Sequence, residues 1–152
     1  MGNINVRIKK LSEKIGKEIN TPQYATAGSA GMDLCACIDA PVILGPGEIK
    51  KIPTGIAIQL PDNTAAGFVF PRSGLSSKHG ISLINCVGVI DSDYTGEIIC
   101  PVVNHSEGSY TINPGDRIAQ IVFMPVCTAE LECVEELAAT GRGDGGFGST
   151  GK

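Results

Sequence analysis

Short runs of valine and isoleucine alternate with glycine and proline along the chain, and this pattern predicts strands separated by turns. The apolar runs cover residues 6–8, 42–44, 56–60, 68–70, 81–84, 98–103 and 118–126. Between residues 55 and 60 apolar side chains alternate with small or polar ones, as expected of a half-buried strand. The 20 glycines and 9 prolines are spread through the chain. Many short strands with regular turns favour an all-β sandwich or barrel.

Helix signals are few. Residues 73–79 predict one short helix, with a serine cap at its start and Gly80 at its end. Residues 11–19 have helix-like spacing, but Gly16 interrupts it. Since no linker or internal repeat divides the chain, we expect residues 1–140 to form one domain.

The last 12 residues, 141–152, differ in composition because six of them are glycine. Such a segment cannot order itself by burying apolar surface. It is either a frayed tail or a mobile arm whose glycines let the backbone approach a ligand. Arg142, Phe147, Ser149 and Thr150 stand among these glycines and favour the arm.

Charge and cysteine content exclude several classes of protein. The net charge of −4 argues against binding along nucleic acid, although a small anionic ligand needs only a few basic groups. No apolar run reaches the roughly 20 residues that span a bilayer, and no export signal is recognisable, so we expect a cytoplasmic protein. The six cysteines form no C-x-x-C pair, which favours reduced thiols over a zinc site.

Three turns carry chemistry that suits phosphates. Asp33 follows a small-residue turn and is either a turn-forming aspartate or an oxygen ligand for Mg²⁺, direct or through water. Arg72, Ser73 and the N–H groups at the start of the predicted helix suit a phosphate, but the same residues also suit an ordinary turn. Gln120 is a further candidate ligand.

Two residues beside Gln120 have a simpler interpretation. Asp116 and Arg117 lie next to each other after a glycine, and we expect them to pair with one another.

Residues 85–96 hold the densest set of candidate groups. The pattern predicts strand, turn and strand, and therefore a hairpin. Asn85 and the exposed backbone suit a planar base edge, and Tyr94 suits packing on a sugar. Asp91 leads three acidic residues between 91 and 97 that are candidate bases. The alternative is a structural hairpin with an acidic turn.

The order of five segments resembles the five motifs of the trimeric dUTPases. The segments are A-G-S-A-G-M-D-L, P-R-S-G-L, N-C-V-G-V-I-D-S-D-Y-T-G-E, G-D-R-I-A-Q and R-G-D-G-G-F-G-S-T-G. The resemblance implies a jelly-roll-like β-barrel or sandwich of the β-clip type, with one short helix after the second motif. It also implies a homotrimer whose C-terminal arms are exchanged to complete active sites built from all three chains.

The activity implied by the resemblance is hydrolysis of dUTP to dUMP and pyrophosphate by water attack on the α-phosphorus. This activity would limit uracil in DNA and supply dUMP for dTMP synthesis. The implied cofactor is Mg²⁺, held mainly by the triphosphate, with Asp33 reaching it through water. The resemblance assigns the phosphates to Arg72, Ser73, Gly74 and Gln120.

The remaining implied roles concern the nucleoside and the arm. Asp91 activates the water and touches the 3′-hydroxyl, and Tyr94 stacks on the deoxyribose and excludes a 2′-hydroxyl. The groups that contact uracil are Asn85, the backbone of Gly88, Val89, Ile90 and Asp91, and the side chain of Ile99. From the arm, Arg142, Ser149 and Thr150 hold the γ-phosphate, and Phe147 covers the uracil ring.

Two other functions are compatible with this type of fold. A dCTP deaminase shares it, but the chain has no matching deaminase base, and its complete arm motif favours the hydrolase. A non-catalytic binding module is expected to have lost Asp91, Tyr94 or the arm, and all three are present.

Overall fold

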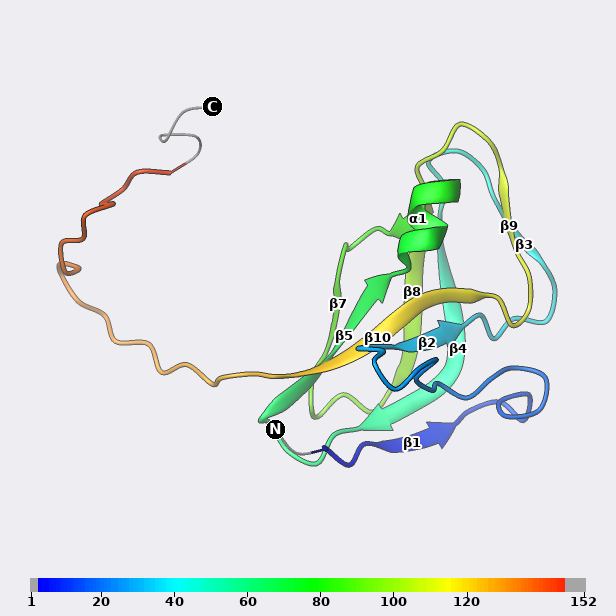
Figure 1. The fold of residues 1–152 in the computed structure, drawn as a ribbon, viewed down its shortest axis with the longest axis horizontal. Helices are drawn as coiled ribbons and strands as arrows, with labels where there is room; N and C mark the ends of the chain where they lie inside the picture. Colours follow the sequence, from blue (N-terminus) through cyan, green and yellow to red (C-terminus); the bar gives the residue numbers. More distant parts are fainter. Residues whose placement is uncertain (1–2, 147–152) are drawn as a thin grey trace.

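The computed structural model describes residues 3–146, and these form ten strands and one short helix (Figure 1). The all-β prediction is therefore confirmed. In chain order the elements are β1 (Arg7–Lys10), β2 (Met32–Cys35), β3 (Val42–Leu44), β4 (Ile49–Gln59), β5 (Ala65–Pro71), α1 (Ser73–His79), β6 (Ile81–Leu83), β7 (Gly88–Ile90), β8 (Glu97–Asn104), β9 (Tyr110–Ile112) and β10 (Arg117–Pro125).

Two four-stranded antiparallel sheets pack face to face in a jelly-roll-like sandwich. One sheet has the order β1-β4-β8-β6 and the other β2-β10-β5-β7, while β3 and β9 form a small separate ribbon. In Figure 1, β10 and β2 cross β8 and β4, which belong to the opposite sheet. Neighbouring strands of a sheet are far apart in sequence, so the order of the chain gives little indication of which strands pair.

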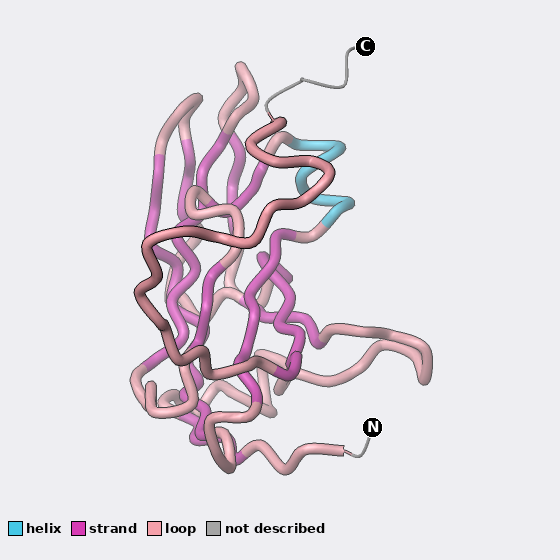
Figure 2. Tube along the Cα trace, turned by 90° about the vertical axis from the view of Figure 1, so that its left-hand side faces the viewer, coloured by secondary structure: helices cyan, strands magenta, loops and turns pink. Residues whose placement is uncertain are grey.

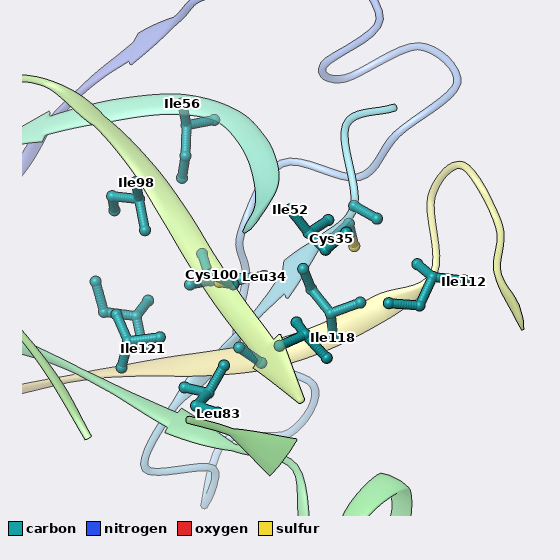
Figure 3. Close-up of a cluster of buried hydrophobic side chains, with 14 of the residues drawn as sticks. Leu34, Cys35, Ile52, Ile56, Leu83, Ile98, Cys100, Ile112, Ile118 and Ile121 are labelled. Atoms are coloured by element: carbon teal, nitrogen blue, oxygen red, sulfur yellow. The ribbon is translucent and has the colours of Figure 1, made fainter. Parts of the chain in front are cut away.

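The core lies between the two sheets and is built from branched aliphatic side chains. Leu34 on β2, Ile98 on β8 and Ile121 on β10 point into the same space and are almost completely buried (Figure 3). Cys100 is buried with them, and burial raises the pKa of its thiol to about 12. This thiol therefore stays protonated and acts as a small apolar side chain.

Strand β4 bends in its middle, at Gly55. Its register with β8 shifts between Pro53 and Ala57, and Gly55 has a φ of 69°. A side chain at this position would be strained by the left-handed backbone. It would also have no room, because a β-carbon would lie 2.6 Å from Cys37 Sγ and 3.1 Å from Ile15 Cδ1. The bend therefore requires glycine.

Hydrogen bonds to β8 hold the bend. The Thr54 hydroxyl donates to the carbonyl of Ile98 at 2.6 Å, and the Gly55 N–H donates to Glu97 Oε1 at 2.8 Å. The Gly55 carbonyl accepts a bond from the N–H of Leu11 at 2.8 Å. These bonds satisfy polar groups that the register shift would otherwise leave unpaired.

The predicted helix at 73–79 is confirmed, but its cap is not a serine. Arg72 is the capping residue, with extended backbone (φ −92°, ψ 128°), and no side chain among the described residues bonds the helix start. Ser73 is already inside the first turn. Gly80 ends the helix as predicted, with a left-handed φ of 68°.

Two other predictions of local structure are wrong. Residues 11–19 form turns around Gly16, which has a φ of 85°, and a single bridge joins Ile15 to Ile19. Both isoleucines are buried because they dock on the core, which explains their helix-like spacing. Residues 85–96 are not a hairpin, since β7 pairs with β5 while β8 is occupied on both sides by β4 and β6.

Beyond β10 the chain leaves the sandwich. Residues 127–144 are exposed throughout, and the segment runs away from the two sheets as a loop (Figures 1 and 2). The six cysteines, all within the described part, are free thiols. Within residues 3–146 the helix is too short to cross a membrane.

Substitution of Gly55 by alanine should destabilise the sandwich. We expect a loss of about 2–4 kcal/mol in the free energy of unfolding, from the left-handed backbone and the overpacked contact with Cys37. Chemical denaturation at one fixed chain concentration measures it. Gly108→Ala is the matched control, because no atom lies within 4 Å of its β-carbon position and its φ is not positive. Equal stability of the two variants would contradict this account of the bend.

Candidate active site

Three charged side chains from distant parts of the chain meet beside the start of α1. Asp33 Oδ1 accepts a bond from Arg72 Nε at 2.8 Å, and Asp33 Oδ2 accepts one from Arg117 Nη1 at 3.1 Å. Arg72 Nη1 also donates to the carbonyl of Arg117 at 3.4 Å. We call Asp33, Arg72 and Arg117 the charged cluster. One carboxylate between two guanidinium groups leaves a net positive charge, which suits a phosphate.

The pairing of Arg117 differs from the prediction. Asp116 accepts bonds from the N–H and the side-chain amide of Asn113 at 2.7 and 3.3 Å, while Arg117 reaches Asp33 instead. A bulge explains this difference. The register of β10 against β2 shifts between Arg117 and Ala119, so the extra residue turns Arg117 to the side of the sheet where Asp33 lies.

The Asp33 carboxylate is compatible with a role toward Mg²⁺ through water. Each of its oxygens already accepts a bond from an arginine, and its side chain is 25% exposed. A carboxylate oxygen has a second lone pair, so each can still accept a water hydrogen. Within residues 3–146 no group of three acidic, histidine or cysteine side chains is placed to hold a metal. A Mg²⁺ ion here would therefore need oxygen ligands from a phosphate substrate.

The other predicted phosphate ligands surround the charged cluster. Ser73 and Gly74 are exposed in the first turn of α1, directly after Arg72. Gln120 lies opposite Asp33 on one side and opposite Phe70 on the other. Its side-chain amide donates to the carbonyl of Pro71 at 3.0 Å, which holds the end of β5 against β10.

A second group of predicted residues lines a small hollow. The hollow has a volume of about 170 Å³ and is lined by Val89, Ile90, Asp91, Tyr94, Glu97, Ile98 and Ile99. Val89, Tyr94 and Ile99 expose large parts of their apolar surface, and Asp91 is exposed as well. A carboxylate beside exposed aromatic and aliphatic surface suits a nucleoside with a water molecule to be activated.

The turn that precedes β7 holds Asn85 and a strained cysteine. Cys86 has a φ of 61°, and among the described residues it is the one non-glycine residue with positive φ. The Val87 N–H donates to the carbonyl of Asn85 at 2.6 Å, which closes the turn. A β-carbon at Gly88 would lie 3.3 Å from Val69 and 3.5 Å from Asn85 Nδ2, so glycine allows the turn to lie against β5.

The two groups of residues occupy opposite ends of β5. Strand β5 ends at Pro71, directly before Arg72, whereas Ile90 lies opposite Gly67 and directly precedes Asp91. The four steps from Gly67 to Pro71 span about 13 Å at about 3.3 Å a residue. Asp91 and Arg72 therefore extend from backbone positions at separate places along β5.

Of the arm, the structure describes residues 141–146, which lie away from the two sheets (Figure 1). Arg142 is exposed, and its Nε donates to the carbonyl of Gly145 at 2.7 Å in a local turn. Phe147, Ser149 and Thr150 lie outside the described residues.

Three neighbours of the site have positions that the sequence did not predict. Arg117 completes the charged cluster, and Gly96 lies against Tyr94. Glu97, one of the candidate bases, lines the hollow while it holds the bend of β4. Each depends on a bulge, a register shift or a close contact between residues near in space. A single sequence carries no direct signal for such features. The one signal it offers is a glycine two residues after Tyr94.

Comparison with known proteins gives one consistent result. The family model described as dUTPase matches residues 17–151. The chain is 52% identical over 147 residues to the deoxyuridine 5′-triphosphate nucleotidohydrolase of Escherichia coli O7:K1, and 51% identical to that of Shigella boydii serotype 18. Each alignment covers 97% of this chain and 97% of the relative.

Solved structures agree with the sequence comparison. The dUTPase of Staphylococcus bacteriophage 80alpha with dUPNHPP superposes with a TM-score of 0.86 at 31% identity, over 97% of this chain and 99% of that one. A mutant dUTPase from phage phi11 of S. aureus, described with a structural Mg(II) ion, gives 0.77 at 27% identity, over 89% and 99%. With these matches across nearly its whole length, the chain belongs to the dUTPase family.

Proposed function

We propose that this chain hydrolyses dUTP to dUMP and pyrophosphate by attack of water on the α-phosphorus. Family membership supports the reaction, because the relatives that match over nearly the whole chain are named deoxyuridine 5′-triphosphate nucleotidohydrolases. The phage relative's ligand dUPNHPP supports a uracil deoxynucleotide as substrate. In a cell the reaction limits uracil incorporation into DNA and supplies dUMP for dTMP synthesis, and we place it in the cytoplasm.

The observation that carries the proposal is the presence of two separate groups of residues, each suited to one part of a nucleotide. The charged cluster suits a phosphate chain, and the hollow beside Asp91 suits a nucleoside and a water molecule. The backbone positions that carry them lie about 13 Å apart along β5. The hollow, at about 170 Å³, is also smaller than the roughly 300 Å³ at which ligand pockets begin. Both facts support a site completed by other copies of the chain, in a homotrimer.

Asp91 is the base that activates the attacking water. Its carboxylate is exposed on the rim of the hollow, where water can reach it. A general base contributes only about 10²–10⁴-fold. Most of the acceleration must therefore come from positioning and from charges that stabilise the transition state.

Uracil specificity follows from the turn and strand at 85–90. Val89, Ile90 and Ile99 line the hollow, and Gly88 and Asn85 precede them in the same segment. The side chain of Asn85 and the backbone of residues 88–90 offer donors and acceptors to the uracil ring. Tight packing against C5 excludes the methyl group of thymine. An amino group at C4, as in cytosine, leaves polar groups of the segment unmatched, and unmatched buried polar groups discriminate strongly.

The charged cluster supplies part of the electrostatic stabilisation. Arg72 binds the phosphate chain with Ser73, Gly74 and Gln120, while Asp33 orients its guanidinium. Mg²⁺ held by the triphosphate would supply further charge neutralisation, with Asp33 reaching it through water. The structural Mg(II) ion of the phi11 relative supports this cofactor.

The arm, residues 141–152, closes over a neighbouring site. Arg142, Ser149 and Thr150 contact the γ-phosphate, and Phe147 covers the uracil ring, so closure expels water from the site. The segment between β10 and the arm supports this exchange, because it is exposed and has four glutamates between 130 and 136. The edge strand β1, with Arg7, Lys9 and Lys10 exposed, offers complementary charge on a neighbouring chain.

Pyrophosphate release tests the reaction and its specificity directly. With dUTP, dCTP, dTTP and UTP compared at equal concentration, we expect rapid release from dUTP alone, and slower release when Mg²⁺ is removed by a chelator. A deaminase would instead release ammonia from dCTP, and that result would overturn the proposal. Absence of turnover with dUTP would indicate a binding module.

Replacement of Asp91 by asparagine should reduce kcat by roughly 10²–10⁴-fold with a modest change in affinity for dUTP, because the base is lost and the shape is kept. The matched control is Asp93→Asn, since Asp93 is an exposed carboxylate two residues away that does not line the hollow among the described residues. Steady-state kinetics and binding of dUPNHPP separate the two effects. Near-normal turnover of Asp91→Asn would remove this residue from the mechanism.

Deletion of residues 141–152 should give a folded trimer that binds dUTP but hydrolyses it poorly. Mixing the deleted chain with the Asp91→Asn chain should restore part of the activity, because some mixed sites then receive an intact Asp91 and an intact arm. Light scattering verifies the trimer, and mass spectrometry verifies mixing. If verified mixed trimers show no recovery, each site is self-contained. A fully active deletion would mean that the arm has no role.

A further inference from the structure

The ring of Tyr94 packs on the backbone of Gly96, two residues further along the same turn. A β-carbon at residue 96 would lie 2.6 Å from Tyr94 Oη, 2.7 Å from Cζ and 3.1 Å from Cε2. Carbon atoms pack at about 3.5–4.0 Å. Any side chain at residue 96 would therefore overlap the ring where it now lies.

Backbone conformation does not explain the glycine. The glycines with positive φ among the described residues include Gly55 and Gly80 but not Gly96. An alanine at this position would meet no backbone strain of that kind. The absence of a side chain at residue 96 is thus what lets the Tyr94 ring approach the backbone so closely.

The same end of the ring is also held by a hydrogen bond. Its hydroxyl donates to the carbonyl of Glu97 at 2.9 Å, and the Glu97 carboxylate accepts the N–H of Gly55 at 2.8 Å. The position of the ring is therefore tied to the bend of β4. Because of this anchor, the ring cannot move away from an added methyl group without stretching or losing a hydrogen bond.

The ring is part of the lining of the hollow. Tyr94 and Glu97 are among the described residues that line it, and Gly96 is not. A methyl group at residue 96 would displace the ring, and the displacement would change the space in which the proposed function places the deoxyribose.

We propose that Gly96 is a positioning residue that sets the clearance between the Tyr94 ring and the sugar of the substrate. The inference rests on the proposed function, since it takes the hollow as the nucleoside site. Gly96 itself touches no substrate and acts through the ring alone. Substitution by alanine changes the shape of the sugar site, whereas removal of the ring widens it.

A double-mutant cycle of Gly96→Ala and Tyr94→Ala tests the proposal. We expect Gly96→Ala alone to raise KM for dUTP about tenfold, the lower end of the effect of one misplaced methylene, with a smaller change in kcat. It should keep the preference for dUTP over UTP, which Tyr94→Ala should reduce. In the Tyr94→Ala background, Gly96→Ala should have no further effect on KM. Gly108→Ala is the control, and its kinetics should match the wild type.

Two results would overturn the proposal. One is an unchanged KM for Gly96→Ala. The other is the same rise in KM with and without the tyrosine ring, which would mean that residue 96 acts through the backbone. If the Gly96→Ala chain does not fold, the thermal stability of each variant replaces KM in the cycle. The double variant with Tyr94→Ala must then fold again. Wild-type turnover of dUTP tests the proposed function separately, because failure there is seen before any variant is compared.

Discussion

The bend of β4 at Gly55 is the constraint on which both the sandwich and the site depend. Strand β4 pairs with β8 on both sides of the bend, and only the part after the bend, residues 56–59, also pairs with β1. The bend is held by the Thr54 hydroxyl and by the Glu97 carboxylate. Glu97 is also a wall of the hollow and accepts the Tyr94 hydroxyl. Glu97 thus links the register shift in β4 to the position of Tyr94 in the candidate site.

The second organising feature is the antiparallel pairing of β5 with both β7 and β10. It brings Gln120 and Arg72 to one end of the strand and Asp91 to the other. Each end has the chemistry of half a nucleotide site. The hollow at the Asp91 end is also bordered by exposed apolar side chains, among them Val89 and Ile99. Exposed apolar surface of this kind marks a site for a ligand or for another protein chain.

Local features of the fold could be predicted from the sequence, and long-range ones could not. The short helix and its Gly80 end follow from local chemistry, and the valine and isoleucine runs coincide with strands of the structure. Which strands pair depends on the whole sandwich, so the expected 85–96 hairpin was wrong. Arg117 was assigned to its neighbour Asp116 because a bulge in β10 cannot be recognised in one sequence. The individual roles of Asp91 and Arg72 stay predictions, based on the resemblance and compatible with their positions.

The turn at Cys86 has a consequence for how such a chain evolves. A left-handed backbone costs a residue with a side chain roughly 1–2 kcal/mol, and glycine or asparagine relieves most of that cost. A more stable sequence is therefore one substitution away, at an exposed position directly after Asn85. The chain carries an oxidisable thiol there instead. The residue at this turn is thus not the one that would make the fold most stable.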